Sequence, residues 1–277
     1  MKIAFNNKLE AIYAIDYCIN RSQNIIGKSV PSEDESFLNE LYRTYLEKIS
    51  DTVRDDVIQL GDFHRKASYV FSASEMLPDL SVFDDFFARN RSLQDRVIAD
   101  IASGPVMSEL HLDALRSFFA INDEHEINIV PSLFINSAFG VFTGETNIIV
   151  GVSYNPSSAR YEIADRLISD IYYEFARPQV QMYLYEKDVR IEKDTELLAE
   201  LITRVLNIVF CTRIYGQEHV ESSLRAQSSG LGQLRIYLSV YLENQSKIYT
   251  LADYVQLLLD AGLATKWNTL DMKNITG

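Results

Sequence analysis

The sequence of 277 residues predicts an α+β fold that is mainly helical and contains a small mixed β-sheet. Apolar residues recur at helical spacing through the first part of the chain, up to residue 121. Strand-forming residues then gather between Glu126 and Tyr154, and helical spacing returns from Thr195 onward. Because no flexible linker marks the change near residue 122, we expect a single integrated unit over 1–277, with a helical section at 1–121 and a core with C-terminal helices at 122–277.

The helical section is divided by breaks between its apolar faces. A stretch rich in Ser, Pro and Asp at 27–35 is one such break, and it offers Ser32 or Asp34 as the N-cap of the next helix. Further along, an aromatic cluster of Phe83, Phe86 and Phe87 favours a core position for these rings. The predicted helices cover 8–20, 35–49, 51–72, 80–103 (as one or two helices) and 107–121.

The central part of the chain has the composition of strands. We predict strands at Glu126–Ile135, Ser137–Thr143 and Asn147–Tyr154, with a turn at 143–146 and a second break at 155–158. An amphipathic helix at 163–178 follows, and we expect Pro178 to end it. The remaining pattern predicts a helix at about 194–213, a loop near 228–230, and helix breaks at 244–247 and 261–262.

The charge balance limits the classes of partner. The chain has 26 basic and 39 acidic side chains, a net charge of −13. Nucleic acid and anionic membranes repel a surface this negative, so we expect neither as a partner. No stretch approaches the ~18 consecutive apolar residues of a transmembrane helix, and the start of the sequence lacks the apolar segment of a signal peptide. The sequence gives no indication of oligomeric state.

Both cysteines, Cys18 and Cys211, fall on apolar faces of predicted helices. This placement favours buried thiols in a reducing compartment over a disulfide or a metal-binding pair. We therefore expect a cytoplasmic protein.

The helix predicted at 163–178 contains the pentapeptide Tyr173-Glu174-Phe175-Ala176-Arg177. It has the frame of the zinc-peptidase motif His-Glu-x-x-His, in which two histidines one turn apart bind zinc and the glutamate acts as general base. The glutamate is kept, but Tyr173 and Arg177 stand at the histidine positions. A phenol has a pKa of about 10 and a guanidinium stays protonated, so neither side chain offers zinc an easy donor.

Other candidate sites for a metal or a cofactor are absent from the sequence. The histidines His64, His111, His125 and His219 are scattered, and no two have the spacing of metal ligands. The turn at 143–146 lacks the Lys and Ser/Thr of a phosphate-binding loop. We therefore expect neither a metal nor another cofactor.

The helix predicted at 194–213 carries two glutamates that share a face. Eighteen residues separate Glu196 from Arg177, a spacing at which glutamate-type zinc peptidases place a third ligand. Glu200 lies one turn later and is followed by Arg204. Taken alone, Glu174 with Arg177 and Glu200 with Arg204 also fit ordinary ion pairs on helix surfaces, worth about 0.2–0.5 kcal/mol each.

The order of these segments resembles a family of uncharacterised bacterial zinc metallopeptidases of the gluzincin type. In that family a pair of strands precedes a His-Glu-Phe-x-His helix that ends near a proline, and a later helix carries Glu-x-x-x-Arg. The stretches 230–232 and 241–254 are similar to its C-terminal part, so the resemblance covers roughly 120–262. It implies a zincin-like core with the sheet beside the Ile163–Arg177 helix. It favours Glu200 as the third-ligand position, whereas spacing alone favours Glu196.

The resemblance, with the metal ligands replaced, implies a catalytically inactive metallopeptidase-like protein that binds a peptide or protein in a vestigial active-site cleft. Glu174 is then a vestigial general base, and an extended ligand would add to an edge strand from 126–154, which requires backbone hydrogen bonds and not zinc. We expect the cleft to be lined by Tyr173, Arg177, Glu196, Glu200 and Arg204.

Arg177 has a specific expected role in this hypothesis. Its fixed cation takes over the charge of the missing metal and neutralises the carboxylates around it. The guanidinium is therefore expected within hydrogen-bonding distance of Glu200 or Glu196. Two other functions stay open: a hydrolase or peptidase with a non-standard metal site or metal-independent use of Glu174, and a structural or regulatory helical protein in which the motif match is accidental.

Overall fold

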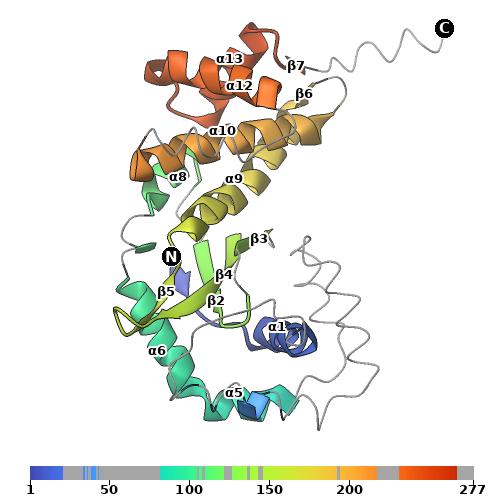
Figure 1. The fold of residues 1–277 in the computed structure, drawn as a ribbon. Helices are drawn as coiled ribbons and strands as arrows, with labels where there is room; N and C mark the ends of the chain where they lie inside the picture. Colours follow the sequence, from blue (N-terminus) through green and yellow to red (C-terminus); the bar gives the residue numbers. More distant parts are fainter. Residues whose placement is uncertain are drawn as a thin grey trace, which may run out of the picture. The chain divides into compact units, whose positions relative to one another are not determined.

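The computed structural model describes residues 1–20, 34, 36, 39–41, 43, 82–104, 106–107, 110–121, 127–135, 138–142, 146–191, 194–216 and 231–266 (Figure 1). Over these residues the protein is an α+β fold, mainly helical, with a small mixed sheet, which confirms the predicted α+β class. Within the same residues, no helix combines the length and the apolarity that crossing a bilayer requires.

The chain divides into two compact units, each built from two separate stretches of sequence. Unit 1 comprises Met1–Leu110 and His125–Glu174, and unit 2 comprises His111–Glu124 and Phe175–Gly277. The long helix α9 (Arg166–Lys187) contributes to both, because the division falls within it, after Glu174. The single integrated unit expected from the sequence stays a prediction.

The sheet of unit 1 contains β1 (Lys2–Ile3), β2 (Ile127–Ser132), β3 (Ala138–Phe142), β4 (Thr146–Asn155) and β5 (Arg160–Ile163). Its order is β1-β2-β4-β3, and β5 pairs with the last residues of β4. β1, β2 and β4 are parallel, whereas β3 and β5 run antiparallel to β4. At the sheet centre the buried Ile129 of β2 pairs with the buried Ile148 of β4, which pairs in turn with Gly140 of β3.

β2, β3 and β4 confirm the three strands predicted between residues 126 and 154. The break predicted at 155–158 is the turn between β4 and β5, where the Asn155 side chain accepts a hydrogen bond from the N–H of Ser157 at 2.9 Å. β1 and β5 were not predicted. With two and four residues, they are too short to show the alternation that identifies a strand in a sequence.

The described helices of unit 1 are α1 (Asn7–Asn20), α5 (Val82–Arg89) and α6 (Arg91–Ala102). They confirm the helices predicted at 8–20 and 80–103, the latter as two helices that meet at Asn90. The rings of Phe83, Phe86 and Phe87 are buried as expected, with Phe86 and Phe87 edge-to-face at 5.4 Å. Within the helix predicted at 35–49, residues 36, 39–41 and 43 are helical. The rest of that range and the helix predicted at 51–72 lie outside the described residues.

Unit 2 contains α8 (Leu112–Phe119), α10 (Thr195–Tyr215), α12 (Leu231–Asn244), a 3₁₀ turn at Gln245–Lys247, α13 (Leu251–Asp260) and the two-stranded pair β6 (Val189–Arg190) and β7 (Thr265–Lys266). α12 packs against both α10 and α13. The buried Tyr254 hydroxyl donates to the carbonyl of Tyr237 at 2.8 Å. The helix ends at Asn244 and Asp260 confirm the predicted breaks, while the loop predicted near 228–230 lies outside the described residues.

The prediction that Pro178 ends its helix is wrong. α9 begins at Arg166 and runs through Pro178 to Lys187. An internal proline costs about 3 kcal/mol, because it removes one backbone hydrogen bond and its ring crowds the preceding turn. Beyond it, Val180 and Leu184 are fully buried, and each such side chain contributes about 1.5–3 kcal/mol. The burial gained by continuing the helix therefore offsets the local cost.

Candidate functional site

Strand β3 and the Glu174 turn of α9 lie in direct contact within unit 1. A Cβ atom placed on Gly140 would lie 2.7 Å from the carbonyl oxygen of Glu174, 2.8 Å from its Cβ and 3.0 Å from its carboxylate Oε2. Real Cβ atoms essentially never approach other atoms below 3.0 Å, so this spacing requires a glycine. The half-buried Glu174 side chain thus lies over the last strand of the sheet.

The sequence contained a signal for this contact that our prediction did not use. A glycine inside a run of strand formers often marks a place where another backbone approaches closely. Gly140 stands in the middle of the five-residue strand β3, between Phe139 and Val141. The sequence pattern could not show which residue contacts Gly140, because Glu174 lies on a helix 34 positions further along the chain.

Pro178 changes the backbone hydrogen bonding of the same turn of α9. In an α-helix the carbonyl of residue 174 accepts the N–H of residue 178, and proline has no N–H to donate. The Glu174 carbonyl is also the atom closest to the position of a Gly140 Cβ. Both residues therefore affect the backbone at Glu174. Pro178 provides no N–H for the Glu174 carbonyl, and Gly140 has no side chain to push that carbonyl away.

Tyr173 and Arg177, which replace the histidines of the motif, are both half-buried on α9. Tyr173 belongs to unit 1 with Glu174, whereas Arg177 belongs to unit 2 with the predicted cleft residues of α10. The cleft that these residues were expected to share therefore stays a prediction.

On α10 the two candidate glutamates differ in environment. Glu196 is exposed in the first turn, close to the N-cap Asp194, whose side chain accepts from Leu197 N–H at 2.9 Å. Glu200 is partly exposed, and its Oε1 accepts from Arg204 Nε at 2.5 Å, one turn later. Both charged side chains of that pair are about one-third exposed, so solvent screens it to the few tenths of a kcal/mol typical of helix surfaces.

The contact expected of Arg177 is absent from the described part of unit 2. There, no hydrogen bond or ion pair joins Arg177 to Glu196 or Glu200. The cation that pairs with Glu200 is instead Arg204, because a Glu–Arg pair four residues apart on one helix needs no tertiary arrangement. Neither glutamate is thereby assigned to the third-ligand position.

The side chains that could bind a metal are dispersed over the described residues. Among them, no three His, Cys, Asp or Glu side chains come together in a way that could hold an ion. His111 precedes α8 as its N-cap residue, and the other histidines lie outside the described range. Cys211 is buried in α10 and forms no disulfide within that range, in agreement with the predicted buried thiol.

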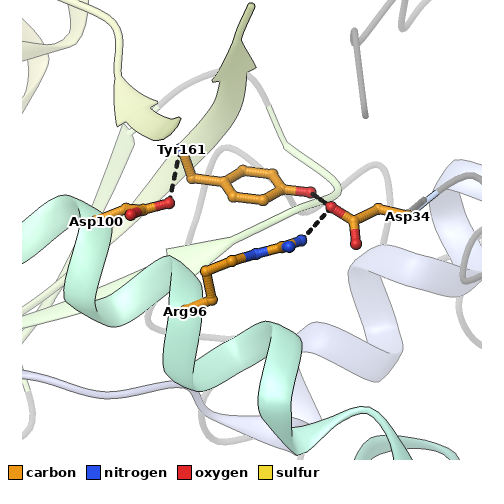
Figure 2. Close-up of polar contacts among 4 residues, drawn as sticks. All are labelled: Asp34, Arg96, Asp100 and Tyr161. Atoms are coloured by element: carbon orange, nitrogen blue, oxygen red, sulfur yellow. Dashed lines mark hydrogen bonds and ion pairs between the residues drawn. The ribbon is translucent and has the colours of Figure 1, made fainter. Parts of the chain in front are cut away.

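Unit 1 also contains a partly buried polar cluster that sequence reasoning missed (Figure 2). The hydroxyl of Tyr161 donates to Asp34 Oδ2 at 2.6 Å, and the guanidinium of Arg96 pairs with the same oxygen. Arg96 also lies over the Tyr161 ring, 5.6 Å from its centroid. On β5, the backbone N–H of Tyr161 donates to Asp100 Oδ2 at 3.0 Å. From the sequence, Asp34 was expected only as a candidate N-cap, and its pairing with Tyr161 and Arg96 was not predicted.

The cluster has the chemistry of a structural tie. Burial, followed by the hydrogen bond to Asp34, raises the pKa of Tyr161 well above its usual value, so the phenol stays a protonated donor. Arg96 compensates the charge of the buried Asp34 carboxylate, which would otherwise be costly. Asp34 lies 127 positions from Tyr161 and 62 from Arg96 in the sequence, so no local pattern could reveal the cluster.

No protein-family model, curated protein or solved structure matches this chain, so the resemblance to gluzincin-type peptidases rests on the residues of this sequence alone.

Proposed function

We propose that this protein is a catalytically inactive, metallopeptidase-like protein that binds an extended peptide along β3, beside Glu174. The observation that carries the proposal is the contact of Gly140 with the backbone and carboxylate of Glu174. It joins the glutamate of the motif frame to the last strand of a mixed sheet, the arrangement that the resemblance implies for a peptidase cleft.

The binding mode follows from the position of β3. Within the described sheet β3 pairs with β4 and ends the strand order, so its other edge can accept a further strand. An added peptide would form backbone hydrogen bonds along the five residues Ala138–Phe142. Because Gly140 has no side chain, the Glu174 carboxylate lies directly over this strand, and we propose that it accepts a hydrogen bond from the added peptide.

The proposed loss of catalysis follows from the residues beside Glu174. A zinc peptidase uses the glutamate to activate a metal-bound water. With Tyr173 and Arg177 at the positions of the histidines, this chain lacks two neutral nitrogen donors there. What is retained is a carboxylate over the last described strand, and the proposed strand addition needs no metal.

The test uses the full chain and a synthetic heptapeptide library. Selected peptides are resynthesised with N-methyl groups on every second amide, in the two possible registers. Strand addition predicts that one register of methylation abolishes binding and that the other is tolerated, because alternate N–H groups face the protein. Equal effects of the two registers, or a library without enrichment, would contradict the proposal.

Two further measurements separate this function from an enzyme. Glu174→Gln should change the affinity of the selected peptide several-fold, whereas Glu243→Gln, the same change on the exposed face of α12, should leave it unaltered. Metal analysis of protein purified without chelators provides the second measurement. Stoichiometric zinc that survives dialysis would overturn the inactive assignment in favour of a peptidase with a non-standard metal site.

A further inference from the structure

A groove of about 290 Å³ lies within unit 2, between the end of α8, the second half of α9 and the first turn of α13. Its walls are largely apolar and include Phe118, Phe119 and Tyr183. Met182 stands at the groove with 45% of its surface exposed, although a thioether side chain gains from burial. Hereafter this site is called the α8/α9/α13 groove.

Gln179 brings a polar side chain into the groove. The residue lines the groove and is only 9% exposed, yet its amide has no hydrogen-bond partner among the described residues. Neither polar atom of this amide is among the fully enclosed side-chain atoms that lack a partner, so the amide keeps access to the open space of the groove. A ligand that supplies a backbone donor and acceptor at this point can form hydrogen bonds with both ends of the amide.

The first turn of α13 adds two hydrogen-bond donors. Thr250 and Asp253 form a capping box, in which the Thr250 hydroxyl accepts from Asp253 N–H and the Asp253 carboxylate accepts from Thr250 N–H at 2.8 Å. The next two amides, of Leu251 and Ala252, have no acceptor among the described residues, as is general for the start of a helix. Both residues line the groove.

The groove carries negative charge. Glu186 lines it, and its described lining includes no lysine or arginine. The Asp253 carboxylate, which is hydrogen-bonded to the lining residue Thr250, adds a second negative charge close by. Burial, followed by the charge of Asp253, raises the pKa of Tyr183. Hydrogen bonds from Thr250 and from Tyr249 N–H lower the pKa of Asp253, which keeps it ionised. An anionic ligand is therefore disfavoured, and a cation beside an apolar group is favoured.

We propose that the α8/α9/α13 groove binds a short peptide segment in which an apolar side chain stands next to a lysine or arginine. The apolar side chain packs between Phe118, Phe119 and Tyr183. Its backbone carbonyl accepts from the amides of Leu251 and Ala252, and Gln179 bonds the adjacent peptide group. The basic side chain extends toward Glu186. This site is independent of peptide addition to β3.

The test is a titration of the ¹⁵N-labelled full chain, followed by NMR, with two peptides that differ in one residue. The probes are acetyl-Gly-Phe-Leu-Lys-Gly-amide and the same peptide with Glu in place of Lys. We expect the Lys peptide to shift the backbone amides of Leu251 and Ala252 and the side-chain amide of Gln179. It should bind about fivefold more tightly than the Glu peptide, since each partly exposed charge contact contributes modestly. The preference should shrink at high salt.

Variants locate the binding. Ala252 is exposed at the groove, so Ala252→Trp should fold normally and fill the site, abolishing the shifts. Glu186→Gln should reduce the preference for Lys to about twofold, while the matched control Glu243→Gln leaves it unchanged. Equal affinity for the two peptides, or wild-type binding to Ala252→Trp, overturns the proposal. Shifts confined to β3 overturn it too, while supporting the function proposed for that strand.

Discussion

The carbonyl oxygen of Glu174 lies 2.7 Å from the point that a Cβ atom on Gly140 would occupy. The centre of β3 is therefore in direct contact with the turn of α9 that carries the Glu174 carboxylate. A side chain at position 140 has to push against helix backbone, which cannot rotate away as a flexible side chain can. Gly140 therefore sets the spacing between the strand and the helix.

Replacing Gly140 with alanine should destabilise unit 1. We expect the overpacked methyl group to lower the free energy of unfolding by about 1–3 kcal/mol, seen as a lower urea midpoint. The matched control is Gly232→Ala at the start of α12, where an added Cβ meets no atom within 4 Å. That change should gain up to about 1 kcal/mol. A Gly140→Ala protein as stable as the wild type would show that β3 and α9 are further apart than described.

Removing the hydroxyl of Tyr161 should weaken the cluster around Asp34. Tyr161→Phe leaves a buried carboxylate with one donor fewer, and a hydrogen bond to a charged group contributes about 1.5–3 kcal/mol. Chemical unfolding should show a loss in that range. Tyr249→Phe is the control, because that ring is 76% exposed and its hydroxyl should contribute nothing measurable. Equal stability of the two variants would contradict a structural role for the cluster.

Alkaline pH should destabilise the protein before the tyrosines of the folded state ionise. Burial raises the pKa of Tyr237 to about 12, and those of Tyr161, Tyr241 and Tyr254 are also raised above 10.0. A group with a raised folded pKa contributes fully below the unfolded pKa, and its contribution is lost as pH rises through the folded pKa. Tyr237 alone should therefore cost about 1.4 kcal/mol per pH unit between 10 and 12.

The measurement for this pH dependence is urea unfolding between pH 8 and 11, together with phenolate absorbance of the folded and unfolded protein. Tyr237→Phe should flatten the decline in stability, because the substituted ring cannot ionise. A stability that stays constant up to pH 11 would disagree with the burial of these tyrosines.

Ala120 offers a stabilising substitution. It caps the end of α8 in the left-handed region, with φ 52° and ψ 35°. That conformation costs an alanine about 1–2 kcal/mol, and glycine adopts it without this cost but loses more chain entropy on folding. Ala120→Gly should therefore raise the free energy of unfolding by up to about 1 kcal/mol. The same change at Ala99, exposed inside α6, should lower it by a similar amount. Thermal and urea unfolding of the two variants should move in opposite directions.

The parts of the fold that the sequence predicted are those governed by local periodicity. The spacing of apolar side chains along the sequence identifies the strands around Ile129 and Ile148 and the helix around Phe86. Pro178 misled the prediction because a local cost was weighed without the burial of Val180 and Leu184, which only the tertiary structure supplies.

The candidate site was predicted less well than the fold. The motif frame pointed to Glu174 but not to its contact with Gly140, because a glycine in a strand indicates a close approach without identifying the partner. Arg204 pairs with Glu200 one turn away on the same helix, a local pairing that the expected role of Arg177 left out of account. Asp34 and Tyr161 meet through the fold alone.

The pairing of β1 with β2 has a consequence for synthesis of the chain on the ribosome. Lys2 pairs with Asn128, so the first strand emerges long before its partner. At about 5–20 residues per second the wait is roughly 6–25 s, during which the strand is open to wrong partners. β1 has only two residues, and one of them is a lysine, a combination that discourages edge-to-edge association. The shortness of β1 thus protects the nascent chain until the rest of its sheet exists.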